Sequence, residues 1–140
     1  MSRALIRRAF EDRLNTWAAG RAPALPVAWE NAAFDPEPVD MYLMGFLLPG
    51  DTTSADLARK NRRFVGLYQV TVVAPLNAGP GAVDAVVAEL SELFDPAVPM
   101  SISGLQVWIS DPLSDGPAIP EPSRYSVPCS IPYLVEAYLP

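Results

Sequence analysis

The chain opens with a helical pattern of hydrophobic positions. Apolar residues recur at steps of three and four, which places them on one face of a helix: Ile6, Phe10, Leu14 and Trp17. This pattern predicts a helix from about Ser2 to Ala19. Ser2 suits its N-cap, and we expect Gly20 to end it in the left-handed conformation.

Strand patterns follow in the first half of the chain. A short strand is predicted at Val27–Asn31, and longer ones at Met41–Leu48 and Phe64–Val73, which is rich in β-branched and aromatic residues. Both faces of Met41–Leu48 are apolar. Such a strand is either central with both faces covered, or presents half of its surface to another subunit.

A long polar bridge, Pro49–Arg63, separates these two longer strands. Compact domains usually join neighbouring strands by a few residues, and longer connections are often functional. The pattern predicts a hairpin with an oversized connection. Within it, Thr53 and Asp56 have the spacing of a capping box, so a helical turn is expected at Ser54–Lys60.

The second half repeats the order of helix and strands. A helix is predicted from about Ala82 to Phe94, with these residues facing inward: Val83, Val86, Val87, Leu90 and Phe94. Strands are predicted at Leu105–Ile109 and Tyr125–Tyr138. Pro128 and Pro132 interrupt the latter, which favours an edge strand or a bend.

The order of elements predicts an α+β fold, with two helices packed on one face of a mostly antiparallel sheet. With 140 residues, half of them hydrophobic, we expect one domain over residues 1–140. The apolar runs are too short to span a membrane, and the N-terminus lacks the apolar core of a secretory signal. We therefore expect the protein in the cytoplasm.

Composition argues against several kinds of chemistry. Histidine is absent and Cys129 is the single cysteine, so the chain cannot hold a Ser-His-Asp triad, a Cys-His pair or an internal disulfide. The acidic loop residues lack ligand-like spacing. We expect no enzymatic activity, no metal and no cofactor. A formal charge of −6 also argues against a dedicated nucleic-acid binder.

Basic residues nevertheless gather in two places. Four of the ten lie at the end of the polar bridge: Arg59, Lys60, Arg62 and Arg63. Three interpretations stay open for them: a solvated loop, a contact with acidic surface on another protein or subunit, or a contact with nucleic-acid backbone. The last needs a ring that multiplies the patch, since no aromatic residue is interleaved to stack on bases.

The second basic group lies in the first turns of the predicted N-terminal helix: Arg3, Arg7 and Arg8. Cations at this end oppose the helix macrodipole, so helix stability does not explain them. We predict that they face solvent or a partner, and that this part of the helix is a candidate interface.

Taken in order, the strand and turn signatures resemble the small tail terminator proteins of long-tailed phages and prophages. The similarity rests on these segments: Leu25–Asn31, Phe34–Pro36, Tyr42–Leu43, Leu47–Pro49, Gly66–Val70, Gly79–Gly81, Phe94, Tyr125–Pro128 and Ile131–Tyr133. None is a chemical motif, and their order and spacing along nearly the whole chain carry the resemblance.

The resemblance implies a structural protein that assembles in the host cytoplasm and resides in the virion tail. Such proteins form a hexameric ring on the finished tail tube, stop its polymerisation and offer a surface to the head–tail connector. The implied partners are further copies of the chain (monomeric when free), the tail tube protein and the connector, with DNA contact only through a ring channel. Another head–tail neck protein is the alternative within this class, and a small ligand-binding domain or enzyme is the alternative outside it.

Overall fold

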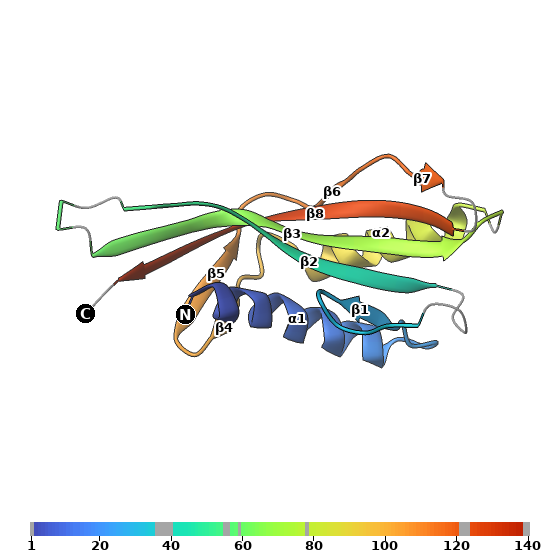
Figure 1. Cartoon of the computed structure of the whole chain (residues 1–140), viewed down its shortest axis with the longest axis horizontal. Helices are drawn as coiled ribbons and strands as arrows, with labels where there is room; N and C mark the ends of the chain where they lie inside the picture. The colour runs from blue at the N-terminus through green and yellow to red at the C-terminus, as the bar shows by residue number, and fades with distance from the viewer. Residues whose placement is uncertain are drawn as a thin grey trace.

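One long, curved sheet carries two helices on one of its faces (Figure 1). The computed structural model describes residues 2–35, 41–54, 57–58, 60–77, 79–120 and 124–138. Its elements are α1 (Ser2–Gly20), β1 (Val27–Trp29), β2 (Tyr42–Thr53), β3 (Asn61–Pro75), α2 (Gly81–Leu93), β4 (Met100–Ile102), β5 (Leu105–Ile109), β6 (Ser114–Asp115), β7 (Ile119–Pro120) and β8 (Arg124–Tyr138).

The strands lie in the order β1-β2-β3-β8-β5-β4. β1 is parallel to β2, and every other described pair is antiparallel. β3 pairs with the whole length of β8, so β5, β6 and β7 follow one another along the opposite edge of β8. The α+β fold predicted from the sequence is confirmed.

The inner face of the sheet forms the core with both helices. On this face Val70 of β3 lies directly opposite Cys129 of β8, and both side chains are fully buried. At its centre Phe10 of α1 stacks on Tyr68 of β3, with ring centroids 4.7 Å apart. Phe94 and Tyr133 pack against the same Phe10 ring at 5.7 and 5.8 Å. Four segments distant in sequence therefore meet at one aromatic cluster.

The two faces of β2 differ in burial. Leu43, Gly45 and Leu47 are buried on the inner face, whereas Met44 and Phe46 on the outer face are half-buried and Leu48 is exposed. No described helix covers the outer face. Of the two alternatives for this strand, the structure therefore favours the one in which half of the surface is available to another subunit.

The prediction of an edge or bent strand for the proline-containing stretch is wrong. β8 is continuous and lies between β3 and β5. The carbonyls of Pro128 and Pro132 accept hydrogen bonds from Gly116 N and Ser110 N, so the backbone of both prolines faces the edge of β5, β6 and β7. Pairing along that edge is already interrupted between the short strands β5, β6 and β7. Because the two prolines lack their N–H groups on that side, the hydrogen-bond ladder between β8 and β3 stays intact.

The helix predictions hold with one correction. α1 and α2 lie where the apolar spacing places them, and Val83, Val86, Leu90 and Phe94 are buried as expected. Gly20 is instead the last residue of α1 and does not have a positive φ. The expected left-handed ending is therefore absent.

Candidate assembly surfaces

A β-sheet arm projects from one end of the molecule (Figure 1). β2 extends to Thr53 and β3 begins at Asn61, so about half of the polar bridge, residues 49–53 and 61–63, is strand rather than loop. The helical turn expected at Ser54–Lys60 lies partly outside the described residues, and of its described residues 57 and 58 are in a turn. Asn61 lies opposite Tyr138, so the end of β8 makes this arm three-stranded.

The four basic residues of the bridge have separate environments. The Arg63 guanidinium binds Glu136 on the neighbouring strand, with Nη2 2.8 Å from Oε1. Arg62 donates to the backbone carbonyl of Asn61. Lys60 is exposed at the start of the arm's second strand, and Arg59 lies outside the described residues. The sequence predicts a single cationic loop. In the structure Arg63 instead forms a cross-strand ion pair, and Lys60 provides a positive charge near the tip of the arm.

Arg7 of α1 is bound within the chain. Its Nη1 lies 2.8 Å from Oε1 of Glu30, and the same carboxyl oxygen accepts the backbone N–H of Leu47 in β2. The hydrogen bonds from Arg7 and Leu47 hold the pKa of Glu30 below its usual value. Arg7 therefore connects α1 to β2 through Glu30. The sequence pattern instead predicts that Arg7 faces solvent or a partner.

Glu30 also helps to protect the edge of β2 beyond β1. It occupies the Leu47 N–H, Pro49 has no N–H, and a β-bulge follows between Pro49 and Thr52. Proline and bulges are the devices by which sheets prevent uncontrolled strand addition at an edge. Contacts of this arm with another chain are therefore expected to use side chains.

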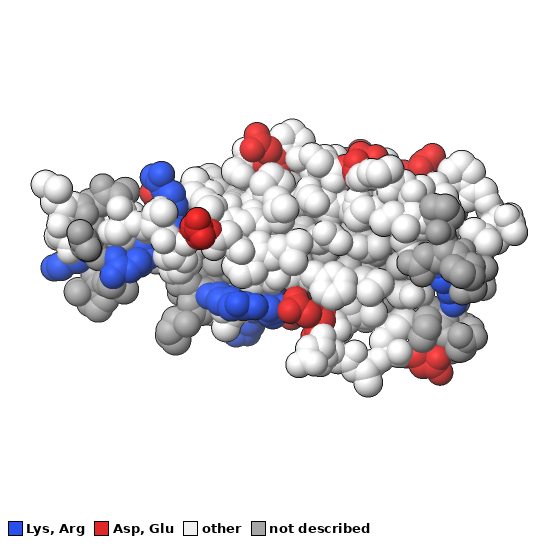
Figure 2. All heavy atoms as spheres, turned by 45° about the horizontal axis from the view of Figure 1, so that its top comes forward, with Lys and Arg blue, Asp and Glu red and all other residues white. Residues whose placement is uncertain are grey.

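Arg3 and Arg8 of the second basic group are exposed, and Arg8 Nε lies 3.8 Å from Asp12 one turn away. Figure 2 shows most of the visible basic side chains in the half of the molecule that carries the arm, while several acidic side chains follow the upper edge. The two basic groups thus lie toward one end of the molecule, and the role of this end as an interface stays a prediction.

An apolar row crosses the outer face of the sheet beside the arm. Leu48 lies opposite Leu67, Val65 opposite Leu134, and Leu134 opposite Trp108. The exposed fractions of Leu48, Val65, Leu67 and Trp108 are 44%, 39%, 37% and 47%. The middle of this face carries few charges (Figure 2). Contiguous exposed apolar side chains of this kind mark protein–protein contacts.

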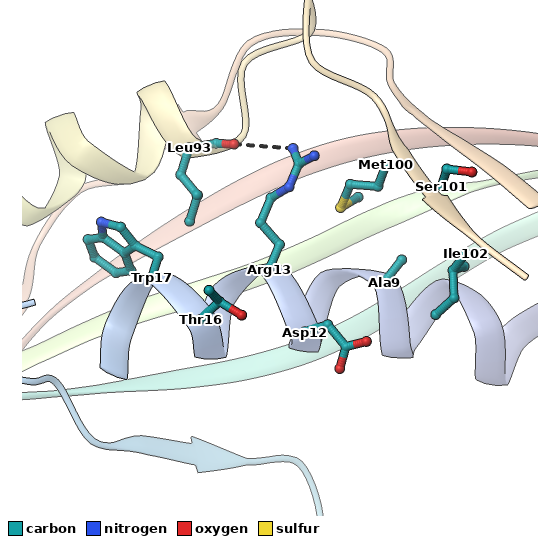
Figure 3. Close-up of a pocket in the computed structure, with 9 residues that line it drawn as sticks. All are labelled: Ala9, Asp12, Arg13, Thr16, Trp17, Leu93, Met100, Ser101 and Ile102. Carbon is teal, nitrogen blue, oxygen red and sulfur yellow. Dashed lines mark hydrogen bonds between the residues drawn. The ribbon is translucent and has the colours of Figure 1, made fainter. Parts of the chain in front are cut away.

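A groove of about 530 Å³ separates α1 from β4 (Figure 3). It is lined by Ala9, Asp12, Arg13, Thr16, Trp17, Leu93, Met100, Ser101 and Ile102. Arg13 donates to the carbonyls of Leu93, Val98 and Pro99, and burial lowers the pKa of its guanidinium. Its donors are thus occupied by backbone, and most of the remaining lining is apolar.

The single cysteine of the chain is a buried core residue. Cys129 is fully buried in β8, and burial raises the pKa of its thiol to about 11. The described residues hold no group of three or more Asp, Glu or Cys side chains that could bind a metal ion. Among the same residues, no helix is long and apolar enough to cross a membrane.

The basic residues are evident in the sequence, but most of these surfaces are not. The groove joins residues about 85 positions apart, and the apolar row joins four strands, so neither has a local signal. Leu57 could have been noticed, because it is the single large apolar side chain between Pro49 and Arg63. In the structure it is fully exposed at the tip of the arm.

Comparison with known proteins places this chain among phage tail proteins. The family model described as "Phage tail terminator protein" matches residues 5–133. A solved structure of similar length superposes with a TM-score of 0.84 at 41% sequence identity, over 100% of this chain and 99% of the other. No curated protein matches the chain. The chain therefore belongs to the phage tail terminator family, a family of structural proteins of the phage tail.

Proposed function

We propose that copies of this protein form a ring on the end of the phage tail tube, stop its polymerisation and offer a surface to the head–tail connector. The family is a structural family of the phage tail. The observation that supports a ring is that one chain has several surfaces of different character. The arm end is cationic, the rest of the molecule is acidic, and an apolar row and a groove lie on different faces.

Unlike surfaces favour a ring for a geometric reason. When one patch meets a different patch on the next copy, the contact is heterologous, and repeated contacts close into a ring if the rotation permits. A hexamer is the number that the family resemblance implies. Self-pairing of identical patches would instead stop at a dimer.

The protected edge of β2 supports controlled assembly. Free subunits with an open strand edge would add to one another without a tube as template. Here Glu30, Pro49 and the bulge limit such addition, which supports monomers before tail completion. In this proposal the tail tube protein orders the ring, and any DNA contact comes through the ring channel.

Electron microscopy of purified tail tubes mixed with the protein tests this function. We expect density at one end of each tube, rings of tube width in side or end view, and tubes that no longer elongate when tube protein is added. Protein that stays strictly monomeric at high concentration and leaves tube ends bare and extendable would contradict the proposal.

A further inference from the structure

The tip of the arm carries an unpartnered apolar side chain. Leu57 has an exposed fraction of 104%, the largest among the exposed large hydrophobic residues of the described chain. Its described neighbour Ala58 and the cation Lys60 are exposed as well. The described residues of the arm leave this leucine open to water, which makes it a candidate for burial in a partner.

The groove between α1 and β4 has the complementary character. Ala9, Met100 and Ile102 contribute apolar surface to its walls, and Thr16 and Ser101 are exposed at its rim. Its volume of about 530 Å³ is within the range of pockets that enclose small apolar ligands. Arg13 lies between Trp17 and Leu93 on one side and Met100 and Ile102 on the other (Figure 3). Its donors are bound to backbone carbonyls.

Charge on the groove also suits the arm. Asp12 lines the groove with an exposed carboxylate that has, among the described residues, only a long contact of 3.8 Å to Arg8, and Glu11 lies beside it on α1. Lys60 lies three residues from Leu57 on the arm. Opposite charges at the rim of an apolar contact steer encounter and fix its orientation.

We propose that the arm of one copy inserts Leu57 into the α1–β4 groove of the neighbouring copy, with Lys60 beside Asp12. The contact rests on the ring described above and names the surfaces that join its subunits. It joins two different patches and so propagates from copy to copy. The arm projects away from α1 and β4 of its own chain, so the occupant comes from a second copy (Figure 1).

Cysteine cross-linking tests the contact directly. Leu57→Cys protein is mixed with Thr16→Cys protein at high concentration and on tail tubes, under mild oxidation. Cys129 is buried and its thiol pKa is raised, so it does not compete. The matched control replaces Thr16→Cys by Ala85→Cys, which lies on the exposed side of α2. We expect disulfide-linked dimers several-fold above the control, and dimers at the control level would overturn the proposal.

A second pair of variants measures the contribution of the leucine. Leu57→Ser removes the apolar side chain, whereas Ala58→Ser changes its exposed neighbour. Burial of a leucine side chain implies that Leu57→Ser weakens association of copies by roughly tenfold or more, with little change for Ala58→Ser. Both changes are exposed and leave the core untouched, so folding is not at issue.

The outcomes separate this contact from the function on which it rests. Leu57→Ser protein that caps tubes as wild type does would overturn the contact and leave the capping function standing. Wild-type protein that cross-links through Thr16 but never caps a tube would support the contact and contradict the function. Cross-linking of Leu57→Cys to the tail tube protein instead would assign the arm to that partner.

Discussion

At the scale of single residues, a few side chains hold together segments that are far apart in sequence. Phe10 brings α1 into contact with rings from β3, β8 and the end of α2. Glu30 holds Arg7 of α1 and the Leu47 N–H of β2 with one carboxyl oxygen. These contacts explain why the helix, β1 and β2 stay packed against one another.

The Glu30 contact predicts a pH-dependent stability. Its pKa is lower in the folded chain than its usual value of 4.5, so its stabilisation is present above that pH and is lost as the pH falls through the folded pKa. Glu30→Gln is expected to lower the free energy of unfolding at pH 7 by about 1 kcal/mol, because the pair is partly exposed.

Denaturation with urea at pH 7 and at pH 3 measures this effect. The difference between wild type and Glu30→Gln should shrink at the lower pH, and the exposed Glu92→Gln on α2 serves as the control. A difference that is the same at both pH values would show that charge on Glu30 does not stabilise the fold.

Replacing glycine by alanine is expected to change the free energy of unfolding in opposite directions at two positions. A Cβ on Gly66 would lie 2.7 Å from the Leu48 carbonyl oxygen and 2.6 Å from the Tyr133 hydroxyl, so Gly66→Ala should cost about 1–3 kcal/mol of unfolding free energy. A Cβ on Gly20 meets nothing within 4 Å, and φ is not positive there. Gly20→Ala should therefore stabilise α1 by roughly 0.5–1 kcal/mol.

Thermal and chemical unfolding of the two variants checks the prediction. A Gly66→Ala protein as stable as wild type would mean that β2 and β8 move apart to admit the methyl group.

At the scale of elements, the helices and most strands could be predicted from local periodicity. The steps of three and four in α1 and α2 place Ile6, Phe10, Val83 and Leu90 in the core. Strand ends were less predictable. The arm residues Thr52, Thr53, Arg62 and Arg63 are polar, and their strand conformation depends on cross-strand pairing that a local pattern does not contain.

The position of β8 shows a similar limit. Pro128 and Pro132 lower the local preference for a central strand, yet β8 lies centrally because the neighbouring edge is broken into β5, β6 and β7. That arrangement is a property of two segments together, so neither one alone predicts it.

Arg13 gives a prediction for the attachment of α1. It donates to three carbonyls, of Leu93, Val98 and Pro99, across the start of β4. Arg13→Met keeps much of the apolar stem but removes these bonds, so the free energy of unfolding should fall by about 1–3 kcal/mol.

Hydrogen exchange locates the effect. Residues 94–102 should exchange faster in Arg13→Met, whereas Arg8→Met, with its long contact to Asp12, should leave them unchanged. Unchanged protection of that segment in Arg13→Met would show that these hydrogen bonds do not hold it.

At the scale of the whole molecule, charge is distributed unevenly, with the basic side chains toward the arm and a net charge of −6. In the proposed ring, Lys60 on the arm of one copy lies beside the exposed carboxylate of Asp12 on the next. Such attraction acts over about a Debye length, roughly 10 Å at 0.1 M salt.

Salt and charge reversal should therefore weaken association together. Copies are expected to associate less as salt rises from 0.05 to 0.5 M (about a threefold change in screening length), and Lys60→Glu should remove part of this dependence. Arg63→Glu is an unsuitable probe, since it also breaks the pair with Glu136. Sedimentation velocity measures the effect, and salt-independent association would contradict an electrostatic role for the arm.

The sequence by itself determined the two amphipathic helices, the main strands, the α+β class and the family resemblance, because each depends on local periodicity or on the order of short segments. Only the tertiary structure decided that Arg7 and Arg63 are paired within the chain, that β8 is central, and that an apolar row and a groove are left open. These features depend on strand register and helix packing, which bring together residues far apart in sequence.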